Sequence, residues 1–244
     1  MSKGSNDIKT DLHNVASTLK RYGICNDVSP LERACGSVKV FDNQSFRYSV
    51  SNLKFNNVPI PRNIGFNSIS AFMVFLDVTL REKNLDMNEI GNPIVVENTS
   101  DNFLFCLRIE CMNRQTRHVD SWHLDYESEN DNEYVHPMFH LTHGGRIMDG
   151  IEVGQSMKLI VPRLPFYPMD AILGIDFIVG NFYKKDTYNR LRGDQLYNKA
   201  VQNAQNRLWR PYFLALSRKW CNHPSIKMDD KSFPSKLSPY IVLS

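Results

Sequence analysis

Apolar and polar residues alternate with a period of two through the middle of the chain. This period is typical of a β-strand that buries one face, because successive side chains point to opposite sides of a sheet. Short connections between successive strands then predict an antiparallel meander. Residues 51–68 are rich in proline and asparagine and are predicted to form a loop. The predicted strands cover residues 38–41, 46–50, 71–80, 103–111, 121–127, 135–141 and 157–161.

Helical spacing of apolar residues precedes this alternation. Residues 7–22 carry an apolar stripe at helical spacing, with Asp7 as the expected N-cap and Gly23 as the stop signal. Pro30 then predicts the start of a short turn or second helix. The chain therefore begins with a helix that can pack on the sheet.

The pattern becomes helical again in the last third of the chain. Residues 169–182 are apolar almost all round, which predicts a helix buried against the sheet. A break is expected near Gly193, and Pro211 is expected to begin or kink the last helical segment. Strands followed by helices predict an α+β fold: an antiparallel β-meander packed against C-terminal helices, with an N-terminal helix.

Composition agrees with one globular unit. The chain has 244 residues, of which 42% are hydrophobic and 23% charged, as in ordinary globular domains. We expect residues 1–221 to form a single α+β domain and residues 222–244 an irregular C-terminal tail. The polar N-terminus is no secretory signal, and no apolar run reaches the roughly 20 residues that span a bilayer, so a cytoplasmic protein without a membrane partner is expected.

Histidines are concentrated in the predicted strands. Five of the seven lie between His118 and His143. The alternation places His123 and Asp125 on one face of residues 121–127, and His136 and His140 on the polar face of residues 135–141. Pairing these strands with residues 103–111 as hairpins predicts Glu110 opposite His123, Arg108 opposite Asp125, and His123 opposite His140 or Met138.

This polar face has two interpretations. Imidazole nitrogens and carboxylate oxygens bind zinc, manganese or iron, and histidine titrates near neutral pH, as acid–base catalysis requires. His123, Asp125, His136 and His140 are therefore candidate catalytic residues and, with Glu110, candidate metal ligands. The other interpretation is a solvated sheet face, on which such residues are ordinary choices. A divalent metal is the one cofactor that the pattern admits, because the chain lacks a glycine-rich phosphate loop and a Gly-x-Ser-x-Gly elbow.

Charge is unevenly distributed along the chain. Residues 184–236 hold twelve Lys or Arg and four Asp or Glu, a local charge of +8, although the whole chain carries only +3. Arg207, Trp209 and Arg210 are candidates for a protein interface or for nucleic-acid binding. Packing in the core and plain solvation of the helices are the alternatives, since acidic residues interrupt the basic run.

Six short motifs lie within residues 120–220. They are Trp122–Asp125, His136–His140, Gly144–Gly145, Pro162–Pro165, Pro168–Phe177 and Leu208–Tyr212. This block resembles an uncharacterised bacterial protein family that occurs in multi-gene systems, including defence-type operons. The layout is also similar to ubiquitin-conjugating enzymes and RWD domains, but no cysteine lies between Cys111 and Cys221, so that resemblance implies a non-catalytic relative.

Two functions follow as expectations. The first is a non-enzymatic accessory subunit of a bacterial multi-protein system, with antiviral defence among the candidates, which binds other proteins of that system or forms a homo-oligomer. The second is a metal-dependent hydrolase or nuclease that uses the histidine and aspartate face. The sequence favours the first, because the second lacks a complete motif.

Overall fold

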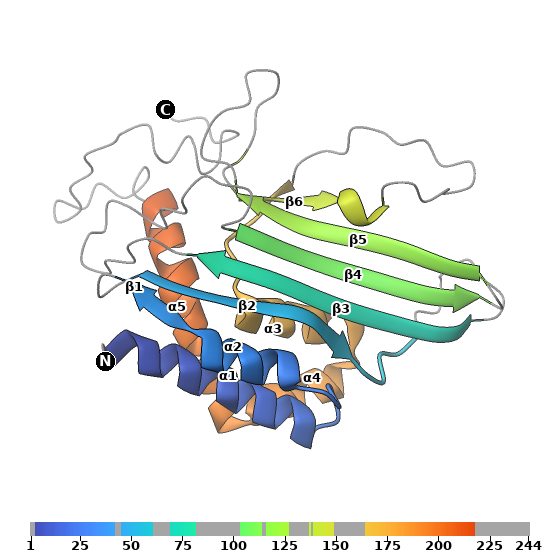
Figure 1. Ribbon diagram of the computed structural model, residues 1–244, viewed down its shortest axis with the longest axis horizontal. Coiled ribbons are helices and arrows are strands. Elements are labelled where there is room, and N and C mark those ends of the chain that lie inside the picture. Colours follow the sequence, from blue (N-terminus) through green and yellow to red (C-terminus); the bar gives the residue numbers. More distant parts are fainter. Residues whose placement is uncertain are drawn as a thin grey trace.

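A seven-stranded antiparallel sheet, with its strands in chain order, forms one layer of the molecule (Figure 1). The computed structural model describes residues 3–41, 45–60, 69–81, 103–113, 116–126, 137, 139–148 and 164–217. The strands are β1 (Lys39–Phe41), β2 (Ser45–Phe55), β3 (Ile69–Arg81), β4 (Phe103–Asn113), β5 (Thr116–Tyr126), β6 (Phe139–His143) and β7 (Leu164–Pro165). The predicted meander is confirmed.

Helices form the second layer, on one side of the sheet (Figure 1). They are α1 (Lys3–Arg21), α2 (Ser29–Ser37), α3 (Ala171–Phe182), α4 (Lys185–Gly193) and α5 (Gln195–Ser217), and a short 3-10 turn, η1 (Arg146–Met148), lies beside β5. The predicted α+β class is confirmed. Among the helices that the structure describes, none is both long and apolar enough to cross a membrane.

The core lies between the two layers. Val74, Leu76 and Val78 of β3 are fully buried, as the predicted alternation requires. Gly174 brings α3 close to the sheet, because a Cβ at this position would lie 2.5 Å from the Phe105 ring. Leu124 of β5 is also buried, so the predicted assignment of its inward face is confirmed.

One predicted loop is wrong in part. Residues 51–55 belong to β2, and Leu53–Phe55 pair with β3, although residues 51–68 were expected to form a loop. A bulge between Val50 and Leu53 interrupts the alternation, and Asn52 adopts a left-handed conformation with a φ of +56°. The period of two therefore breaks inside the strand, which hid its second half. Residues 61–68 and the strand predicted at 157–161 lie outside the described residues.

Helix termini show which capping signals were correct. Gly23 has a φ of +66° and lies two residues after the last residue of α1, Arg21, which confirms the predicted stop. Asp7 is wrong as an N-cap, because α1 begins at Lys3 and residues 3–6 carry no apolar residue that could mark their helical turn. Pro211 begins no new helix, since α5 runs through it to Ser217.

Candidate functional site

Three of the predicted site residues meet on the outer side of β5 and β6. Asp125 and His140 are direct cross-strand partners, so their side chains point to the same side of the sheet. The Asp125 Oδ2 atom lies 3.0 Å from His123 Nε2 and 3.6 Å from His140 Nε2. One carboxylate therefore faces two imidazoles, and we call these three residues the histidine cluster.

His123 is held from two sides. Its hydrogen bond to Asp125 raises the pKa of the imidazole; burial lowers the pKa, and a hydrogen bond to the Gly144 backbone raises it further. Gly145 packs directly on the ring, because a Cβ there would lie 2.9 Å from His123 Cε1, and its φ of +84° also favours glycine. Acceptors at Asp125 and Gly144 stabilise the imidazolium form of His123.

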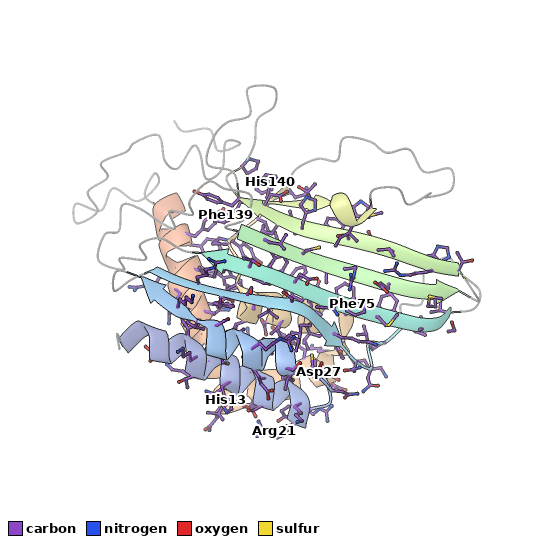
Figure 2. The ribbon with its side chains drawn as sticks, in the orientation of Figure 1. His13, Arg21, Asp27, Phe75, Phe139 and His140 are labelled. Carbon is purple, nitrogen blue, oxygen red and sulfur yellow. The ribbon has the colours of Figure 1, made fainter. Side chains whose placement is uncertain are left out.

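His140, which is labelled in Figure 2, belongs to the polar face. It is nevertheless almost completely buried. Its Nδ1 atom lies 2.9 Å from the Pro137 carbonyl oxygen, which can only accept a hydrogen bond. Nδ1 therefore donates, and Nε2 is the atom that faces Asp125. The cluster therefore places two imidazole nitrogens around the Asp125 carboxylate, and its buried side is His140.

Glu110 does not join the histidine cluster, so the predicted pairing with His123 is wrong. It lies opposite Val119, and Cys106 lies opposite His123. Arg117 donates to both Glu110 oxygens, at 2.6 and 3.2 Å, and this contact lowers the pKa of the carboxyl. The register differs because β5 begins at Thr116 and β4 ends at Asn113, so the turn is shorter than expected.

The predicted partners of two further pairs also change. Arg108 lies opposite Ser121, where Asp125 was expected, and His123 lies opposite Thr142. Cys106 and Ser121 contact each other through Sγ and Oγ at 3.4 Å.

A second histidine–aspartate pair was missed by the sequence reasoning. His143 Nε2 lies 2.5 Å from Asp120 Oδ1, and the imidazole meets the Trp122 ring edge-on at 5.0 Å. By the alternation of β5, Asp120 points to the side of the sheet opposite Asp125. Only the β5–β6 register brings the two residues together. The predicted strands covered residues 121–127 and 135–141, so neither Asp120 nor His143 was expected in a strand.

Metal binding gains no support from the described part of the chain. Within it, no group of three or more His, Cys, Asp or Glu side chains is arranged to hold a metal ion. His136, one of the five predicted ligands, lies outside the described residues.

The side of the sheet opposite the helices is called the open face. It consists of the odd-numbered residues of β3 and β5, the even-numbered residues of β4, and their cross-strand partners in β1, β2 and β6. Near its centre the Arg108 guanidinium lies 4.4 Å from the Phe75 ring centroid, and Lys54 lies 5.9 Å from it. No described helix covers this face (Figure 1).

Arg207 and Trp209 are placed inside the molecule. Arg207 Nη1 donates to Asp11 at 2.7 Å, and Arg207 Nη2 lies 3.7 Å from Asp170. Trp209 Nε1 donates to the Pro168 carbonyl at 2.8 Å. Both side chains therefore serve the packing of α5, contrary to a surface role, and Arg210 alone of the three candidates is exposed.

Comparison with known proteins assigns no family. No family model, no curated protein and no solved structure matches the chain.

Proposed function

We propose that the protein is a non-enzymatic binding subunit of a multi-protein system and that its partner protein binds the open face. The observation that carries this proposal is the one-sided arrangement of the fold. All the described helices lie on one side of the sheet (Figure 1). The other side presents side chains that the hydrophobic core does not include.

The exposed residues of the open face suit a protein interface. Leu104 is 47% exposed, although it lies within a central strand, opposite Thr79 of β3. Lys54 and Arg117 are exposed on the same face. An apolar side chain among arginines and lysines is typical of a binding surface with a polar rim.

The histidine cluster supports a binding role over catalysis. A general base needs a lone pair directed at a substrate. His123 instead has Asp125 on one side and the Gly144 backbone on the other, and so it ties β5 to the turn after β6. Such an arrangement is typical of a side chain that stabilises the fold.

Co-purification with a matched pair of variants tests the proposal. Leu104→Glu places a charge on the open face, whereas Leu196→Glu changes an equally exposed leucine, 51% exposed, on α5. We expect the wild-type protein and Leu196→Glu to retain the same stoichiometric partner from the source organism, and Leu104→Glu to lose it. Retention of the partner by Leu104→Glu would contradict the proposal.

The alternative is a metal-dependent hydrolase or nuclease that uses His123, Asp125 and His140. One observation favours it: a histidine that donates Nδ1–H to a backbone carbonyl, as His140 does, has the orientation common among metal ligands. Elemental analysis of the purified protein tests it. Stoichiometric zinc, manganese or iron that is lost in Asp125→Asn would support the alternative, and metal-free protein that added metal does not stabilise would rule it out.

A further inference from the structure

Two basic residues lie side by side on the first two strands. Arg47 of β2 is the direct cross-strand partner of Lys39 on β1. Direct partners point to the same side of a sheet with Cα atoms roughly 4.5–5.5 Å apart. Lys39 and Arg47 therefore place like charges side by side on the open face, and we call these two side chains the cationic row.

This row lacks counter-charges in the described part of the chain. Lys39 and Arg47 are exposed, and neither forms an ion pair or hydrogen bond there. Like charges directly opposite each other destabilise a sheet. In the free protein these like charges therefore repel each other, and a bound anion would reduce that repulsion.

The acidic residues of the open face are engaged elsewhere. Asp77 accepts the Asn52 backbone N–H at 2.7 Å. Glu110 is held by Arg117, and Asp125 lies in the histidine cluster. The described acids of this face therefore leave the cationic row unneutralised.

We propose that the cationic row binds an acidic segment of the partner protein. This inference rests on the proposed function and names the chemistry of the partner at the same face. The positions that follow along the open face carry no charge: Ser49 comes next on β2, Thr79 lies opposite it on β3, and the exposed Leu104 follows on β4. A segment with carboxylates and an apolar residue complements this surface in charge and in polarity.

Nucleic acid fits the surface less well. Among the open-face residues whose side chains the structure describes, Phe75 is the only Phe, Tyr or Trp, and Arg108 and Lys54 lie over its ring. Sheets that bind single strands stack bases on aromatic side chains that are free to receive them. The sequence pI of about 8.5 is also below the value above 9 that is typical of nucleic-acid-binding domains.

Binding measurements with poly-L-glutamate test the inference. The variant is Lys39→Glu with Arg47→Glu, and the charge-matched control is Arg190→Glu with Lys199→Glu, at exposed positions of α4 and α5. We expect the variant to weaken poly-L-glutamate binding roughly tenfold or more, and the control to change it less than about twofold, because only the variant places acids against the bound carboxylates. Equal weakening by the control would overturn the inference. Tighter binding of a DNA oligonucleotide with the same sensitivity to the variant would also overturn it.

Thermal unfolding gives a second readout that needs no partner. Arg47→Glu turns the repulsive pair with Lys39 into an attractive one. We expect this variant to unfold at a higher temperature than the wild type, and added poly-L-glutamate to stabilise the wild type alone. A lower unfolding temperature in Arg47→Glu would contradict the repulsion on which the inference depends.

The native partner separates this inference from the proposed function. If Leu104→Glu loses the partner and Lys39→Glu with Arg47→Glu keeps it, the cationic row is excluded and the open face remains the binding surface. If both variants keep the partner, both proposals fail. If both variants lose the partner, the result supports the proposed function and the cationic row together.

Discussion

His123 lies on the polar face of β5, and its contacts connect this strand to the turn after β6. The alternation of β5 correctly placed it beside Asp125 and away from Leu124. Its contact with Gly144 and Gly145 could not be predicted, because two glycines after a strand are equally typical of a plain turn. The contact depends on which residues of β5 and β6 pair, and a period of two does not contain that information.

The raised pKa of His123 predicts how its contribution to stability depends on pH. Contacts with Asp125 and Gly144 raise the pKa above 6.5, so His123 in the folded state binds its proton more tightly than in the unfolded chain. Its contribution is therefore full below pH 6.5 and is lost as pH rises through the folded pKa. We expect His123→Gln to lower the free energy of unfolding more at pH 5.5 than at pH 8.5 in urea titrations. His13→Gln, at an exposed position of α1, is the control substitution (Figure 2). A pH-independent effect of His123→Gln would exclude this linkage.

At the scale of elements, strand identity was easier to predict than strand pairing. Residues 103–111 and 121–127 were correctly predicted as neighbouring antiparallel strands. The pairing of Glu110 was wrong because β5 begins five residues before the predicted strand, in the polar segment Thr116–Asp120. That end of β5 buries less of its surface, so its alternation of apolar and polar residues is too weak to mark it as a strand.

The approach of α3 to the sheet depends on Gly174. A Cβ at this position would lie 2.5 Å from the Phe105 ring and 3.3 Å from Leu76, and both side chains are buried. Overpacking of this kind costs about 1–3 kcal/mol. We expect Gly174→Ala to lower the free energy of unfolding by that amount in chemical denaturation. Gly180→Ala is the control on the same helix, because its Cβ would only touch Tyr188 at 3.5 Å; alanine there should be neutral or stabilising by up to about 1 kcal/mol. Equal costs at both positions would show that helix packing on Phe105 is not the cause.

At the scale of the whole molecule, the net charge of a sequence segment did not predict which of its basic side chains are exposed. The local charge of +8 over residues 184–236 includes Arg207. The guanidinium of Arg207 pairs with Asp11 of α1 and with Asp170 at the start of α3, inside the molecule. Burial raises the pKa of both carboxyls, and Arg207 opposes that effect. Arg207, Asp11 and Asp170 belong to three segments that are distant in sequence, and only the tertiary fold brings them together.

Removing Arg207 should therefore weaken the whole fold. In Arg207→Leu two buried carboxyls lose their cation, and an uncompensated buried charge costs about 3–5 kcal/mol. We expect this loss in the free energy of unfolding at pH 7, measured by chemical denaturation. Arg210→Leu, at an exposed position of the same helix, should cost less than about 0.5 kcal/mol. A small effect of Arg207→Leu would indicate that solvent reaches the site.

The two outermost strands limit how this sheet can grow. β1 has three residues, and β7 has only Leu164 and Pro165, the second of which has no backbone N–H to donate. Short edges and an edge proline discourage the addition of a further strand from another chain. Copies of the protein should therefore not join edge to edge into ribbons, and the sheet keeps its width at high concentration.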